Sequence, residues 1–147
     1  MYDRILVPTD GSEQRPVVAQ AMNVAELADA TVHALYVVDE RALDYQPSES
    51  GREETRDARR EEGEEATHHI AEAGADRGVE VVTAIEEGKP AKAIVSYADE
   101  KDADMVVMGT HGRTGLDHYL IGSVTEKVVR LADVPVLTVP LPEETSD

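Results

Sequence analysis

Five short apolar runs, separated by longer segments with helical patterning, constrain the fold more than any other feature of the sequence. The runs cover residues 4–8, 31–38, 79–85, 104–109 and 134–139, and each is typical of a strand. Strands that alternate with helices of this length imply right-handed crossovers and a parallel sheet covered on both faces. The sequence therefore predicts an α/β fold: a single doubly wound domain with a five-stranded, mostly parallel sheet and helices on both faces.

Helices are expected between the runs. Residues 12–30 place Val17, Ala21 and Ala25 on one face, with Ser12 and Glu13 at the start. Residues 50–77 are charged and alanine-rich and predict an outer helix, which Gly63 weakens. A third helix opens at Pro90, and a fourth covers residues 123–132. Residues 39–56 contain no apolar run and are expected to be the least ordered part, and residues 141–147 form a short acidic tail after a domain of residues 1–140.

Composition excludes several classes of function. The 147 residues suffice for one core, and the absence of cysteine rules out a disulfide framework, a thiolate metal site and a cysteine nucleophile. The formal charge of −17, from 31 acidic against 14 basic residues, makes nucleic acid an unfavourable partner. It favours a halophilic host with a salt-rich cytosol, and an acidic mesophilic protein is the alternative. No signal-peptide core or long apolar span occurs, so we expect a cytoplasmic protein that does not enter a membrane.

The loop after the fourth run carries the clearest functional signal. In open parallel sheets, ligands bind at the carboxyl ends of the strands. Glycines let backbone N–H groups approach phosphate oxygens, and the start of the next helix adds unpaired donors and the positive end of a dipole. Gly109, Gly112, Gly122 and Ser123 are therefore a candidate cradle for a polyphosphate, with Arg113 as the one nearby cation.

Two better-known phosphate loops do not fit the sequence. A Walker loop needs Gly-Lys followed by Ser or Thr, but Gly88-Lys89 is followed by Pro90. A dinucleotide fingerprint needs three spaced glycines after the first strand, where this chain has Pro8-Thr9-Asp10-Gly11-Ser12. The glycine loop must therefore bind by another pattern.

The spacing of Gly109, Gly112, Gly122 and Ser123 is similar to the ATP-binding pattern of the universal stress protein family. The resemblance extends to the opening Ile5-Leu6-Val7-Pro8-Thr9-Asp10, the Gly88-Lys89-Pro90 helix start and the closing strand. It implies a Rossmann-like fold of the adenine nucleotide alpha hydrolase type, and ATP with Mg²⁺ carried on the nucleotide. It further implies that Asp10 lies beside the ribose, that Val37 contacts the adenine, and that Gly109, Gly112, Gly122, Ser123 and Val124 contact the phosphates. Pro8, Thr9, Met108 and Arg113 complete the expected binding site.

Structural alternatives stay open for several of these residues. Asp10 could instead cap the first helix. The glycines could serve only as turn residues with positive φ. His111 could be a solvated loop residue with no role in binding. His68 and His69 are adjacent in a helix and do not make a same-face metal pair, so no metal site held by the protein itself is expected. In the similar family the last strand, from Val134 to Val139, pairs across a two-fold axis, which implies a homodimer, and a covered edge in a monomer is the alternative.

The leading hypothesis is an ATP-binding regulator of the stress response, with an unidentified protein partner and at most slow ATP hydrolysis. No residue is assigned a catalytic role, because no nucleophile and base are paired in the sequence. A nucleotide-free dimerisation or adaptor module is one alternative. A small enzyme acting on adenine nucleotides is the other, although such an enzyme normally carries an added substrate domain.

Overall fold

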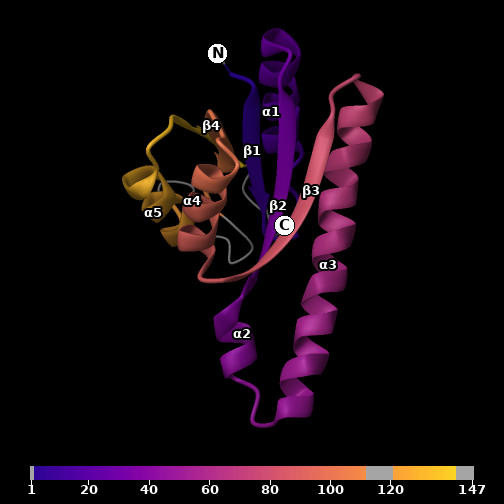
Figure 1. Cartoon of the computed structure of the whole chain (residues 1–147), viewed down its shortest axis with the longest axis vertical. Coiled ribbons are helices and arrows are strands. Elements are labelled where there is room, and N and C mark those ends of the chain that lie inside the picture. Colours follow the sequence, from indigo (N-terminus) through magenta and orange to yellow (C-terminus); the bar gives the residue numbers. More distant parts are fainter. Residues whose placement is uncertain (1, 112–120, 142–147) are drawn as a thin grey trace, which may run out of the picture.

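The computed structural model has one parallel sheet between two layers of helices (Figure 1). It describes residues 2–111 and 121–141. The elements, in chain order, are β1 (Arg4–Thr9), α1 (Arg15–Ala28), β2 (Thr31–Asp39), α2 (Glu40–Asp44), α3 (Glu49–Asp76), β3 (Val81–Gly88), α4 (Pro90–Glu100), β4 (Met105–Gly109), α5 (Ser123–Leu131) and β5 (Val136–Val139).

All strand pairs are parallel, and the strand order is β3-β2-β1-β4-β5. The chain starts in the middle of the sheet, builds one half outward through β2 and β3, and then crosses to build the other half. The prediction of a doubly wound five-stranded α/β domain is confirmed. The junction between the halves is short: β1 pairs six residues with β2 but two with β4, through Ile5 and Leu6.

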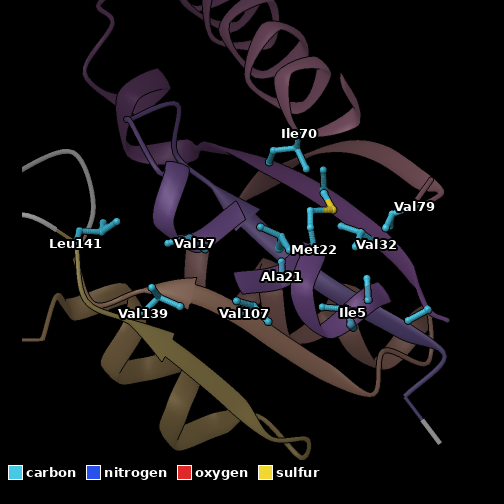
Figure 2. Close-up of a cluster of buried hydrophobic side chains, with 14 residues drawn as sticks. Ile5, Val17, Ala21, Met22, Val32, Ile70, Val79, Val107, Val139 and Leu141 are labelled. Atoms are coloured by element: carbon cyan, nitrogen blue, oxygen red, sulfur yellow. The ribbon is translucent and has the colours of Figure 1, made fainter. Parts of the chain in front are cut away.

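One face of the sheet is covered by α1 and α3. Ile5 and Val7 of β1 point into this layer, where Met22 of α1 and Ile70 of α3 pack over them (Figure 2). The buried face of α1 follows the predicted helical spacing of Val17, Ala21 and Ala25, with Met22 added. Small side chains on this helix let it lie close to the strands.

The opposite face is covered by α4 and α5, which lie across the sheet from α3 (Figure 1). Leu6, Leu35 and Val106 alternate in direction with the residues of the first layer, as the two-residue period of a strand requires. Its buried polar pair joins β2 to α4: Nδ1 of His33 lies 2.8 Å from the hydroxyl of Tyr97.

The long helix α3 approaches the sheet closely at Gly63. A Cβ built on Gly63 would lie 2.5 Å from Cδ1 of Tyr36, so only glycine fits against this ring. The hydroxyl of Tyr36 donates a 2.7 Å hydrogen bond to Glu62, the preceding residue of the helix. The glycine that weakened the sequence prediction is therefore the contact point between helix and sheet.

The expectation that residues 39–56 are the least ordered part is wrong. This segment contains all of α2 and the start of α3, and α2 is anchored by Leu43, which is 1% exposed. Asp39 caps α2 by accepting from the N–H of Arg41, and Ser48 caps α3 by accepting from Gly51. This segment has no apolar run, but the caps at the starts of α2 and α3 and the buried side chain of Leu43 are enough to order it.

Other element boundaries differ from prediction by a few residues. Helix α1 begins at Arg15 rather than Ser12, because Pro16 opens the first turn and residues 10–14 form a separate turn. The third strand runs to Gly88, paired with β2 along its full length. Leu141, assigned to the tail, is buried in the first layer, and residues 142–147 lie outside the described part of the chain. Within the described residues, no helix is long and apolar enough to span a membrane.

Candidate functional site

A cavity of about 350 Å³ lies at the carboxyl-terminal edge of the sheet, where β1, β2 and β4 end. Strands contribute Pro8, Thr9, Tyr36, Val37, Asp39, Met108 and Gly109, and the loops after them contribute Asp10, Gln14 and His111. Helices and the residue before α5 contribute Arg41, Ala42, Arg59, Pro90, Ile94, Gly122, Ser123, Val124 and Thr125. Its size is within the range of small-molecule sites.

The predicted site residues come together around this cavity, with two exceptions that the structure does not describe. Those in the lining are Pro8, Thr9, Asp10, Val37, Met108, Gly109, Gly122, Ser123 and Val124. Gly112 and Arg113 lie outside the described residues. Residues from the beginning, the middle and the end of the sequence thus line one cavity, as expected for strand ends in a parallel sheet. That each of them contacts a ligand stays a prediction.

One wall of the cavity is the N-terminus of α5. Gly122 precedes the helix in an extended conformation, with φ −62° and ψ 154°, and its N–H donates a 2.6 Å hydrogen bond to the carbonyl of Thr110. Helix geometry leaves the first backbone N–H groups of α5, beginning at Ser123, without acceptors inside the helix. With the helix dipole, they make this wall suited to an anion.

The two glycines that flank this wall are also closely packed. A Cβ on Gly109 would lie 2.7 Å from Cδ1 of Leu141, and one on Gly122 would lie 3.2 Å from Cα of His111. The carbonyl of Gly109 accepts a 2.7 Å hydrogen bond from the hydroxyl of Thr125, which ties the end of β4 to α5. Gly109 lies in β4 and Gly122 has φ −62°, so neither occupies the positive-φ turn position of the structural alternative, and their close contacts are with Leu141 and His111 instead.

Asp10 does not cap α1, so that alternative is wrong. The residue at the cap position is Gln14, and its side chain makes no capping hydrogen bond. Oδ1 of Asp10 instead accepts from the N–H of Ser12 at 3.0 Å and from its hydroxyl at 2.5 Å. This turn holds the carboxylate at the end of β1, beside the cavity.

A second wall is apolar. Val37 packs against the cluster that contains Ile94 of α4 and Met108 of β4, and Pro90 begins α4 beside them. Proline at the start of α4 presents a rigid ring, and Val124 closes the same side from α5. The cavity therefore has an apolar slot next to an anion-binding helix end.

Two cations at the cavity were missed by the sequence analysis. Arg113 was expected to be the one nearby cation, but Arg41 of α2 and Arg59 of α3 line the cavity as well, so that expectation is wrong. Arg41 lies two residues after the end of the second strand, close to where ligand-binding residues are expected in a parallel sheet. Arg59 lies within a long charged helix, and no local pattern marks it.

These arginines flank Asp39. Burial raises the pKa of Asp39, but hydrogen bonds from the side chain and the N–H of Arg41, with the charges of Arg41 and Arg59, outweigh it and lower the pKa overall. The guanidinium of Arg41 lies 2.7 Å from the Asp39 carboxylate, and this pairing raises the pKa of Arg41. Asp39 is therefore a charged carboxylate that fixes Arg41 at the cavity mouth.

His111 also lines the cavity, with Nδ1 3.3 Å from the hydroxyl of Thr110. Among residues 2–111 and 121–141, no three histidine, aspartate or glutamate side chains gather closely enough to hold a metal ion.

Comparison with known proteins agrees with this architecture. Residues 1–140 match the model of the universal stress protein family. Universal stress protein MJ0531 of Methanocaldococcus jannaschii is 41% identical over 145 residues, which cover 98% of this chain and 85% of the relative. The solved structure of MJ0577, from the same organism, has a TM-score of 0.87 and 33% identity, and the match covers 98% of this chain and 99% of that one. A universal stress protein from Archaeoglobus fulgidus, solved in complex with dAMP, shares the fold with a TM-score of 0.71 at 24% identity, over 93% of this chain and 97% of that one.

Proposed function

The chain belongs to the universal stress protein family, and on that premise we propose that it binds ATP in the cavity at the carboxyl edge of its sheet and acts as a nucleotide-dependent regulator. The observation that carries this proposal is the meeting of three walls around one cavity: the N-terminus of α5, the apolar slot beside Val37 and the carboxylate of Asp10. Each wall matches a different part of an adenine nucleotide.

The phosphates belong at the start of α5. Backbone N–H groups at Ser123 and Val124, the Ser123 hydroxyl and the helix dipole together offer donors and positive potential to phosphate oxygens. Because the whole chain carries a formal charge of −17, a polyphosphate needs such a local exception in order to bind. Mg²⁺ would arrive on the nucleotide, where it neutralises phosphate charge, and would need no cage of protein carboxylates.

The adenosine part belongs across the strand ends. The slot formed by Val37, Pro90 and Ile94 offers apolar surface to the flat adenine ring, while Asp10 offers an acceptor to the ribose hydroxyls. The A. fulgidus relative in complex with dAMP supports an adenine nucleotide as the class of ligand. We propose binding and sensing as the main role, with ATP hydrolysis slow at most.

We further propose a homodimer formed along β5. This strand is the outer neighbour of β4 and exposes 37% of Leu137, and the preceding helix α5 exposes Leu131 and Val129 at 52% and 49% of their surfaces. Gly109 at the cavity pairs in register with Val139 of β5, so the nucleotide site and the edge are one strand apart. This proximity offers a route by which nucleotide binding changes association. An unidentified protein partner would then bind one association state of the protein in preference to the other.

We further propose a salt-rich cytoplasm as the location of the protein, because its acidic composition suits high salt. We therefore propose assays in molar KCl, with a low-salt series in parallel. A melting temperature that rises with KCl concentration supports the halophilic assignment, because salt screens the repulsion between carboxylates.

The first test of ATP binding is direct. Protein purified in molar KCl is denatured and the released nucleotides are identified, and the apo protein is titrated with ATP and Mg²⁺ by calorimetry. We expect an adenine nucleotide in the released fraction, or a melting temperature that rises with ATP concentration. No released nucleotide together with no heat and no thermal shift would rule out the proposed function.

A Ser123→Pro variant tests the phosphate position. Proline is well tolerated at the first helical residue, and the extended conformation of Gly122 is one that a following proline favours. The change removes one N–H donor and the hydroxyl, so we expect ATP affinity to fall by at least about tenfold. Glu49→Pro, at the first residue of α3, is the matched control and should leave the affinity unchanged. Equal ATP affinity in Ser123→Pro and wild type would place the phosphates elsewhere.

A further inference from the structure

Gln14 is a cavity residue with no assigned role. It precedes α1 at the helix cap position, yet its side chain makes no capping bond and instead turns toward Asp10. Nε2 of Gln14 lies 3.4 Å from Oδ1 of Asp10 and 3.5 Å from the hydroxyl oxygen of Ser12. The side chain is thus placed against the carboxylate that faces the ribose in the proposed complex.

The carbonyl oxygen of this amide finds no donor in the described part of the chain. Oε1 of Gln14 is buried, and it accepts no hydrogen bond from the described residues. Exchanging the oxygen and nitrogen would place the oxygen against the Asp10 carboxylate, two acceptors face to face, so the neighbour fixes the amide orientation. A buried acceptor without a donor is unfavourable and rare, and at a binding site it indicates a group supplied by the ligand.

The chemistry of an adenine nucleotide limits which group that is. Ionised phosphate oxygens only accept hydrogen bonds, and the proposed phosphate position is at α5. The amino group of adenine is a donor, but the apolar slot that fits the base is formed by Val37 and α4. The ribose hydroxyls are donors and belong at the end of β1, where Asp10 and Gln14 lie. The contact between Nε2 and Asp10 is long, at 3.4 Å, and the terminal torsion of a glutamine side chain is soft, so binding of a hydroxyl can loosen this contact and turn the covered oxygen toward the cavity.

We propose that Gln14 accepts a hydrogen bond from one ribose hydroxyl of the bound nucleotide, and that it thereby makes the site select ribonucleotides over deoxyribonucleotides. The inference rests on the proposed function and adds to it a residue that recognises the sugar of the nucleotide. Asp10 and Gln14 act together: Asp10 positions the amide of Gln14 before the nucleotide binds, and the amide oxygen then accepts a hydrogen bond from the ribose hydroxyl.

The test compares sugars and variants. Affinities for ATP, 2′-deoxy-ATP and 3′-deoxy-ATP, each with Mg²⁺, are measured by calorimetry on wild type, Gln14→Met and Gln20→Met. Methionine matches the length of glutamine without its acceptor, and Gln14→Leu provides a second apolar variant should methionine pack poorly. Gln20 is exposed on the same helix, so Gln20→Met is the matched control. Each variant is compared only with itself across the three nucleotides, and melting without nucleotide verifies its fold.

We expect wild type and Gln20→Met to bind ATP about three- to tenfold more tightly than one of the two deoxy analogues. In Gln14→Met this preference should disappear, through weaker ATP binding with unchanged binding of that analogue. A sugar preference that persists in Gln14→Met, or wild-type affinities that are equal for all three nucleotides, would overturn the inference and leave ATP binding in place. If wild type binds none of the three, the inference is overturned together with the proposed function.

Discussion

A Gly63→Ala substitution tests the packing of α3 on the sheet. Inside an ordinary helix this change stabilises by about 1 kcal/mol, because alanine has the higher helix propensity. Here the new Cβ would lie 2.5 Å from Cδ1 and 2.7 Å from Cγ of Tyr36. The ring has little room to move, since it is 3% exposed and its hydroxyl is bonded to Glu62 at 2.7 Å.

Because the ring is held, we place the overpacking cost at about 2–3 kcal/mol, the upper part of its usual range, which exceeds the propensity gain of about 1 kcal/mol and leaves a net loss of about 1–2 kcal/mol in the free energy of unfolding. The melting temperature should fall by about 3–8 °C, measured by circular dichroism in molar KCl. Gly51→Ala is the control, because its Cβ would meet side-chain atoms alone, the capping Oγ of Ser48 at 3.1 Å and Oε1 of Gln46 at 3.2 Å.

Repeating the Gly63→Ala substitution in a Tyr36→Val protein tests whether the ring of Tyr36 causes the loss of stability. In a Tyr36→Val protein the ring is gone, so adding Gly63→Ala should no longer destabilise and should recover up to about 1 kcal/mol. Stabilisation by Gly63→Ala in the wild-type background, equal to that of Gly51→Ala, would refute the close approach of α3 to Tyr36.

Two further predictions concern pH and association. Burial lowers the pKa of His33, helped by the charges of Arg4 and Lys101, so the unfolded state binds a proton first as pH falls below 6.5. The free energy of unfolding in urea should therefore drop between pH 7.5 and 5.5, and drop less in His33→Gln; equal drops would contradict this. Leu137→Glu should convert the dimer to a monomer in analytical ultracentrifugation, whereas Leu27→Glu, at a site 90% exposed on α1, should not; a wild-type monomer would exclude the β5 dimer.

The strand pattern was enough to predict the sheet and the location of the cavity. Apolar runs alternating with helices admit few topologies, and the carboxyl ends of parallel strands must lie along one edge. Asp10, Val37 and Gly109 follow or end three different runs, so their common position was predictable without knowledge of any contact. Gln14 and Arg59 were not, because a single polar residue in a turn or on a charged helix has no pattern until its neighbours are known.

The sequence analysis misjudged segments in which a single capping or anchoring residue, rather than a run of apolar residues, determines the secondary structure. Ser48 before Glu49 is a helix cap, and Leu43 alone anchors α2, but a search for apolar runs passes over both. Pro16 was the better signal for the start of α1 than Ser12, whose hydroxyl is taken by the turn at Asp10. Gly63 was weighed by helix propensity, whereas its role is decided by the ring of Tyr36 across the interface.

The junction between β1 and β4 is the shortest strand pairing in the sheet, and we expect local opening to begin there. The β3-β2-β1 half is joined through eight and six register pairs, whereas β4 joins it through two. A local opening along this junction would release β4, α5 and β5 while the other half stays folded. The cavity has Asp10 and Val37 on one side of the junction and Gly109 and Ser123 on the other, so a ligand bound across it would act as a clasp. Amide hydrogen exchange in β4 and β5 would then report occupancy of the proposed site, and a bound nucleotide would make the outer edge of the sheet more rigid.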